Sequence, residues 1–180
     1  MKWAAAFAPD GKHILVSSHN GSRLTLHKTS DGAVVHVFDD AKFSDWVRNI
    51  AWQPSGTAVA FSCGAEAFIW EPLRGPPTVT QRFAIDKEGK EKGKFRVFIN
   101  VDIRWSADGA FALVACSDGT VEVWNAESNT KWRMMKPQGK TCNAVKGGQF
   151  LVDNTKGGGE SSGKTLISVD GDGSVRFWDM

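Results

Sequence analysis

The sequence predicts an all-β protein built from about four repeated antiparallel sheets, and three observations support this. A glycine suited to a hairpin turn recurs along the chain, at Gly11, Gly56, Gly109 and Gly163. A second tight turn follows each of these glycines nine or ten residues later. The strand after that second turn reaches a tryptophan in the last three copies, five residues past the turn, at Trp70, Trp124 and Trp178.

The spacing of the copies indicates what kind of repeat they form. Successive tryptophans are 54 residues apart, and the first two turn glycines are 45 apart. Repeats of this length are typical of β-propeller blades rather than of short solenoid repeats. An aromatic residue also stands four positions before the turn glycine in three copies, at Phe7, Trp52 and Trp105. The sequence therefore predicts a single β-propeller domain over residues 1–180, made of four-stranded blades.

The first two blades are expected within residues 1–42 and 43–86. Apolar runs in the first predict strands at Ala4–Phe7, His13–Ser18, Arg23–His27 and Ala33–Phe38. The corresponding strands of the second are Val47–Trp52, Ala58–Ser62, Ala67–Trp70 and Val79–Ile85. The tight turns carry residues that favour them, in Pro9-Asp10-Gly11, Asn20-Gly21 and Pro54-Ser55-Gly56.

The third and fourth blades are expected within residues 95–136 and 140–180. The third has strands at Val97–Ser106, Phe111–Cys116, Val121–Trp124 and Lys131–Met135. Its middle strands are apolar on both faces, as expected where sheets pack on either side. The fourth blade is stretched and lacks an outer strand after its third, which predicts an exposed flank at Trp178 and an unpaired strand ending at Asp179.

Two long segments are predicted to be loops. Residues 86–94 mix four Lys with three acidic residues, as expected of a charged, solvated loop between blades. Residues 153–164 are rich in Gly and Ser, and they replace the first hairpin turn of the fourth blade with an enlarged loop.

The turn and strand motifs resemble the WD40 repeat family. Its blades carry a Pro-Asp-Gly-type turn, an Asp-Gly turn and a Trp-Asp pair, which correspond here to Pro9-Asp10-Gly11, Asp118-Gly119, Asp172-Gly173 and Trp178-Asp179. Trp124-Asn125 and Trp70-Glu71 are weaker copies of the pair, the Gly-His pair of the family is missing, and Leu26 or His27 fills the first tryptophan position. The resemblance implies divergent repeats, and four blades against the family's usual number of about seven imply a partial propeller.

The composition argues against nucleic-acid binding, membrane binding and a disulfide-stabilised fold. The chain has 22 basic and 20 acidic residues, a net charge of +2, which gives no case for a nucleic acid or membrane partner. Its three cysteines form no disulfide framework, since Cys63 and Cys116 occupy one repeated interior position. There is no charged-then-apolar leader and no apolar run of membrane-spanning length, so an intracellular protein of the cytoplasm or nucleus is expected.

One motif suggests a different function. Residues 158–165, Gly-Gly-Glu-Ser-Ser-Gly-Lys-Thr, satisfy the phosphate-binding pattern through Gly158, Gly163, Lys164 and Thr165. That chemistry needs the start of a helix directly after the Lys-Thr pair, so that backbone N–H groups face the phosphates. Strand-type sequence follows instead, so we interpret the motif as loop, and we expect no cofactor, no nucleotide and no metal site.

The resemblance implies a non-catalytic interaction scaffold, or a subunit of a larger complex, that binds proteins or peptides. In the family, the usual contact face collects the loops between blades and the turns between second and third strands. The residues of this chain expected there are His19, Trp46, Arg48, Asp118 and Asp172. Trp46 and Arg48 are the favoured anchors, because Trp and Arg are enriched among residues that dominate interfaces. Trp132 is a further candidate for an exposed anchor.

Two alternatives remain open at this stage. A nucleotide-binding enzyme built on residues 158–165 predicts a helix after Thr165. A structural half-propeller completed by another chain, or a piece of a longer protein, predicts apolar surface exposed at both ends and an oligomeric or unstable isolated chain.

Overall fold

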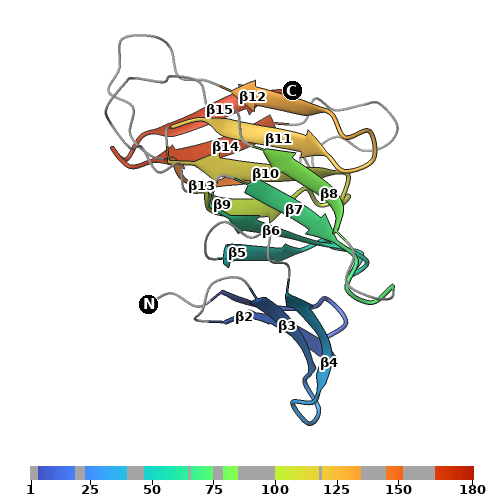
Figure 1. The fold of residues 1–180 in the computed structure, drawn as a ribbon. Coiled ribbons are helices and arrows are strands. Elements are labelled where there is room, and N and C mark those ends of the chain that lie inside the picture. Colours follow the sequence, from blue (N-terminus) through green and yellow to red (C-terminus); the bar gives the residue numbers. More distant parts are fainter. Residues whose placement is uncertain are drawn as a thin grey trace.

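The computed structural model describes residues 4–18, 23–39, 47–64, 66–74, 79–84, 100–117, 119–134, 145–151 and 165–180. All the regular secondary structure of these residues is β-strand, arranged in four antiparallel sheets (Figure 1). The predicted all-β propeller architecture is confirmed.

Each sheet is one blade, and its strands lie in sequence order. Blade 1 contains β1 (Ala5–Phe7), β2 (His13–Ser17), β3 (Arg23–Lys28) and β4 (Val34–Asp39). Blade 2 contains β5 (Val47–Trp52), β6 (Val59–Cys63), β7 (Glu66–Trp70) and β8 (Val79–Ala84). Blade 3 contains β9 (Asn100–Trp105), β10 (Phe111–Cys116), β11 (Val121–Asn125) and β12 (Lys131–Met134). Blade 4 contains only β13 (Val145–Phe150), β14 (Thr165–Asp170) and β15 (Val175–Asp179) within the described residues.

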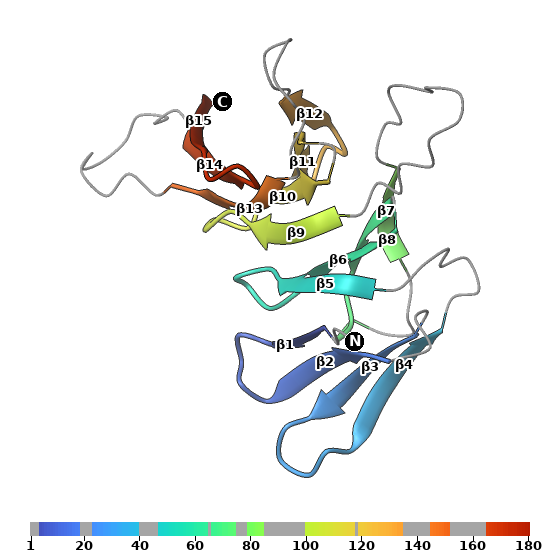
Figure 2. The ribbon, with the colours of Figure 1, turned by 90° about the vertical axis from the view of Figure 1, so that its left-hand side faces the viewer.

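In blades 1 to 3 the expected strands agree with the observed ones to within one residue at every end except the start of β9, since residues 97–99 lie outside the described part. In blade 4, β15 has no outer neighbour among the described residues, as predicted. The first strand of each blade adjoins the first strand of the next, so that the blades follow one another in chain order (Figure 2).

The repeated glycines close the first hairpin of blades 1 to 3 in the same way. Gly11, Gly56 and Gly109 have φ angles of 67°, 77° and 73°, in the left-handed region that favours glycine. Each donates its N–H to the carbonyl three residues back, over 3.0, 2.8 and 2.9 Å. The fourth member of the series, Gly163, lies outside the described residues.

Each blade has two packing faces, and neighbouring blades share a core. We call the face toward the preceding blade the leading face. In blades 1 to 4 it carries, in this order, His27, Trp70, Trp124 and Trp178. The face toward the following blade is the trailing face, and it carries Leu26, Ile69, Val123 or Phe177. One apolar cluster joins the trailing face of blade 1 to the leading face of blade 2. A second cluster joins blade 2 to blade 3 in the same way, and a third joins blade 3 to blade 4.

The cross-strand register resolves which residue fills the first tryptophan position. His27 lies opposite Ile14, as Trp70 lies opposite Val59 in blade 2. His27 is therefore the equivalent residue, and Leu26 belongs to the opposite face. The His27 ring meets polar partners, with its Nδ1 3.0 Å from the Gly32 carbonyl oxygen and its Nε2 2.9 Å from the Thr25 hydroxyl.

Polar contacts between blades supplement the apolar clusters. The indole N–H of Trp52 donates to the Ala6 carbonyl over 3.0 Å, and that of Trp105 donates to the Ala51 carbonyl over 2.9 Å. The tryptophan before the turn glycine thus ties blade 2 to blade 1 and blade 3 to blade 2. In addition, the Gln53 amide donates to the Gly109 carbonyl over 2.7 Å, which fixes blade 2 to the first turn of blade 3.

Candidate interaction surfaces

The two ends of the strands form two opposite faces of the molecule. The loop face carries the turns between second and third strands and the connections between blades. The hairpin face carries the turns that join first to second and third to fourth strands. Arg48 and Asp172 belong to the loop face, since Arg48 lies near the start of β5 and Asp172 lies between β14 and β15.

The structure describes two of the five residues predicted to bind a partner. Arg48 is exposed, directly after the buried Val47. Asp172 is also exposed, and its carboxylate accepts hydrogen bonds from the Ser174 backbone N–H over 3.0 Å and from the Ser174 hydroxyl over 2.6 Å. Asp172 therefore stabilises its own turn. The other three, His19, Trp46 and Asp118, lie outside the described residues, and their role stays a prediction.

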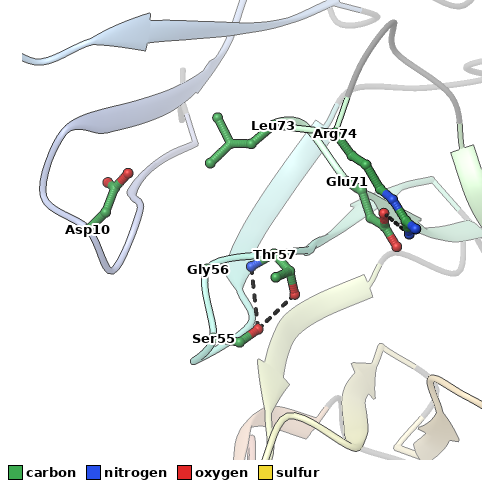
Figure 3. A pocket seen from close by; sticks show the side chains of 7 residues that line it. All are labelled: Asp10, Ser55, Gly56, Thr57, Glu71, Leu73 and Arg74. Carbon is green, nitrogen blue, oxygen red and sulfur yellow. Dashed lines mark hydrogen bonds and ion pairs between the residues drawn. The ribbon is translucent and has the colours of Figure 1, made fainter.

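The hairpin face carries a pocket that the sequence did not indicate. Turns of blades 1 and 2 enclose about 610 Å³ and line the pocket with Asp10, Ser55, Gly56, Thr57, Glu71, Leu73 and Arg74 (Figure 3). Arg74 is paired with Glu71 over 2.9 Å, and the Ser55 and Thr57 hydroxyls lie 2.8 Å apart. The Leu73 side chain is 45% exposed. Only the arrangement of two blades brings these turns together, so local sequence carried no signal for the pocket.

The charge of Asp10 in this pocket is stabilised locally. His13 Nδ1 lies 2.8 Å from Asp10 Oδ2, and the Lys12 backbone N–H donates to Oδ1 over 2.8 Å. The hydrogen bond with His13, followed by that from Lys12, lowers the pKa of Asp10. This lowered pKa stabilises the folded state at pH values above the ordinary pKa of an aspartate. The stabilisation is lost as the pH falls through the pKa that Asp10 has in the folded protein.

We expect His13→Ala to raise the pKa of Asp10 toward its ordinary value, because the largest cause of the shift is removed. The carboxyl carbon shift of Asp10, followed by NMR through an acid titration, measures this. His27→Ala is the matched control, since His27 lies on the same blade and its ring contacts Thr25 and Gly32. An unchanged Asp10 titration in the His13 variant would contradict the assignment.

A second hollow lies between the outer edges of blades 3 and 4. It measures about 550 Å³ and is lined by Phe111, Trp132, Arg133, Met134, Asp179 and Met180. Trp132 is 46% exposed, and its ring centroid lies 5.9 Å from that of Phe111. The exposed position expected for Trp132 is confirmed.

The two end blades expose apolar side chains on their outward faces. Ten large apolar side chains of the described residues are exposed, and six of them lie on these two faces. Phe7, Val34 and Val37 lie on the leading face of blade 1; Val169, Val175 and Phe177 lie on the trailing face of blade 4. The expectation of apolar surface at both ends is confirmed.

The repeated core position of Trp178 is confirmed, but the exposed flank expected at this residue was wrong. Trp178 does not face the open end, because it packs with the cluster that joins blade 4 to blade 3, and its indole N–H donates to the Ser168 hydroxyl over 2.9 Å. The exposed flank belongs to its neighbour Phe177, since successive residues of a strand point to opposite faces.

Comparison with known proteins agrees with this geometry. The family model of the WD domain, G-beta repeat, matches residues 96–125, which include β9, β10 and β11. Residues 96–125 are therefore a WD40 repeat, in agreement with the strands and turns of blade 3. A search of curated proteins gave no significant match.

Solved structures show the same propeller fold over nearly all of this chain. U3-55K matches with a TM-score of 0.71 and 17% identity, over 98% of this chain and 48% of that one. Sqt1 from Saccharomyces cerevisiae matches with a TM-score of 0.73 and 13% identity, over 100% of this chain and 45% of that one. This chain thus spans just under half the length of the WD40 propellers that it matches.

The described residues lack the helix that a nucleotide-binding site at residues 158–165 would require. Strand β14 begins at Thr165, where that alternative needs a helix. The rest of the motif, including Gly158, Gly163 and Lys164, lies outside the described residues. In the described ranges no three His, Cys, Asp or Glu side chains gather to hold a metal ion, and no helix there is long and apolar enough to cross a membrane.

Proposed function

We propose that this chain is a non-catalytic scaffold that binds protein or peptide partners through its loop face. The observation that carries the proposal is a rigid frame with an exposed arginine at that face. Three shared apolar clusters hold the blades in register, and Arg48 stands exposed beside the buried Val47 at the edge of this frame. An arginine held on a rigid strand loses little conformational entropy on binding.

The location of Arg48 gives a direct test. Proteins captured from a cell extract by the wild-type chain are compared by quantitative mass spectrometry with those captured by Arg48→Glu. Arg74→Glu, on the hairpin face with its side chain 83% exposed, is the matched control. We expect Arg48→Glu to lose bound partners by about tenfold or more and the control to retain them. Partners that depend on Arg74 but not on Arg48 would overturn the choice of face.

A second candidate function is structural, and the exposed end faces favour it. In this function the chain is a half-propeller that another chain completes, so that its outward blade faces become buried. The six exposed apolar side chains on those faces support this proposal, since soluble monomers rarely expose large apolar patches.

Both functions are compatible with an intracellular location, in the cytoplasm or nucleus, which we propose as well. Cys63 and Cys116 are buried thiols within two of the shared apolar clusters, and thiols persist in reducing compartments.

A further inference from the structure

The pocket on the hairpin face lies at the junction of blades 1 and 2, where blade 1 has a short side chain. At the next junction, Gln53 of blade 2 covers the turn glycine of blade 3, since a Cβ atom at Gly109 would lie only 2.9 Å from Gln53 Cγ. The residue equivalent to Gln53 in blade 1 is Ala8, because each stands three residues before its turn glycine and accepts that glycine's N–H. The Ala8 side chain does not cover Gly56, and the pocket opens over this glycine.

The hydroxyl groups of the pocket lining can act only as acceptors toward a ligand. The Ser55 and Thr57 hydroxyls lie 3.0 and 2.7 Å from the Gln53 amide oxygen and 2.8 Å from each other. That amide oxygen is held in place because the amide nitrogen donates to the Gly109 carbonyl over 2.7 Å. Each hydroxyl proton is therefore used within this group, and the two oxygens offer lone pairs rather than donors.

The charged groups of the lining favour a cation. Asp10 and Glu71 bring two carboxylates, whereas Arg74 brings one positive charge, which is paired with Glu71 over 2.9 Å. Each Asp10 oxygen has one partner at 2.8 Å, the Lys12 backbone N–H or His13 Nδ1, and can accept a further hydrogen bond. A ligand that suits this lining therefore carries a positive charge and several N–H donors.

Leu73 adds an apolar wall to the pocket. Its side chain is 45% exposed, and it points toward the side of the pocket where Asp10 lies (Figure 3). An arginine side chain combines an apolar stem with a planar group of five N–H donors, so it can cover Leu73 and still reach a carboxylate. A free cation would leave Leu73 exposed to water, whereas the residue next to an arginine in a peptide can cover it.

We propose that this pocket binds a peptide segment in which an arginine stands next to an apolar side chain. The volume of about 610 Å³ lies within the range of about 300–1,000 Å³ that is usual for ligand pockets. The proposal goes beyond the scaffold function, because the pocket lies on the hairpin face and Arg48 lies on the opposite loop face.

The test is the binding of short peptides to the isotope-labelled full chain, followed by NMR. The probes are the acetylated and amidated peptides Ala-Leu-Arg-Leu-Ala and Ala-Leu-Glu-Leu-Ala, which differ only in the charged residue. We expect the arginine peptide to shift the backbone amide signals of Ser55, Thr57 and Leu73, with a dissociation constant below about 1 mM. The glutamate peptide should leave these signals unchanged, since it would bring a like charge to Asp10.

Charge variants of the lining should change the affinity in opposite directions. Asp10→Asn should weaken binding of the arginine peptide by about threefold or more, because it removes a negative charge. Arg74→Glu should strengthen binding by about threefold or more, because it adds a negative charge and releases Glu71 from its ion pair. Asp31→Asn is the matched control and should keep the wild-type affinity. Asp31 lies on the same face outside the pocket lining, and it accepts a backbone N–H over 2.9 Å as Asp10 does.

A third variant tests the shape of the pocket. Ala8→Gln gives blade 1 the side chain with which blade 2 covers Gly109, so it should abolish binding of the arginine peptide. Thermal unfolding of each variant shows that it folds. The two charge variants decide the matter if Ala8→Gln does not fold, because both change side chains at the protein surface.

Three results would overturn the proposal. One is the absence of shifts at the pocket with about 5 mM arginine peptide, well above the expected dissociation constant. Another is that the arginine and glutamate peptides shift the same signals equally. The third is that Asp10→Asn binds the arginine peptide as tightly as Asp31→Asn does. The scaffold function is tested separately, since Arg48→Glu should lose its partners and still bind the arginine peptide.

Discussion

Replacement of Trp70 by alanine is expected to lower the free energy of unfolding by about 3–5 kcal/mol, the usual cost of deleting a buried aromatic side chain. Trp70 is fully buried on the leading face of blade 2. Its ring centroid lies 5.1 Å from that of Phe38, which belongs to blade 1. The substitution therefore leaves a cavity between blades 1 and 2, and it weakens the packing at the interface that joins them.

Urea unfolding followed by circular dichroism measures this cost. Trp132→Ala is the matched control, because it removes the same side chain from a site that is 46% exposed, and it should cost less than about 1 kcal/mol. Hydrogen exchange adds a spatial readout. Because each repeat contacts only its neighbours, Trp70→Ala should accelerate exchange in blades 1 and 2 more than in blade 4. Equal costs for the two tryptophans would contradict the core role of Trp70.

The strands of this protein were predictable because their signals are local. A turn glycine with a left-handed φ, such as Gly56, marks the end of one strand and the start of the next. The fixed distance from the second turn to Trp70 and Trp124 then placed both tryptophans correctly in the core. These features depend on a few neighbouring residues, so they can be predicted without knowledge of the tertiary structure.

Features that depend on how blades meet could not be predicted in the same way. The turn-to-tryptophan spacing also gave Trp178 a core position, but the exposure of its neighbour Phe177 depends on whether another blade covers that face of β15. The hairpin-face pocket needs the turns of two blades placed side by side, including Asp10 and Leu73. No spacing in the sequence encodes that juxtaposition.

The two described candidate binding residues, Arg48 and Asp172, differ in how much of their setting the sequence indicates. Arg48 was chosen because it flanks the start of a blade, and its exposure agrees with that choice, but its role in binding stays a prediction. The turn-stabilising contacts between Asp172 and Ser174 were not anticipated, although an Asp-Gly turn often closes through its aspartate side chain. A residue type that suits both a turn and an interface therefore cannot be assigned from its position alone.

Substitution of Gly148 by alanine is expected to cost about 1–3 kcal/mol, the usual range for overpacking a core. A Cβ atom at this position would lie 3.0 and 3.1 Å from the two methyl groups of Leu113 and 3.2 Å from the Ile167 carbonyl oxygen. Leu113 is fully buried on the trailing face of blade 3, so it has little room to move. Glycine at this point therefore lets β13 of blade 4 approach blade 3 closely.

The adjacent glycine provides the control for this prediction. A Cβ at Gly147 would find its nearest neighbour 3.4 Å away, at the carboxylate end of Asp102, which is ordinary contact. Gly147→Ala should therefore change the free energy of unfolding by about 0.5 kcal/mol or less. A double-mutant cycle then identifies the clash. Leu113→Ala should cost less in the Gly148→Ala background than in the wild type, because the shortened side chain makes room for the added methyl group. Additive costs would show that the penalty at Gly148 arises elsewhere.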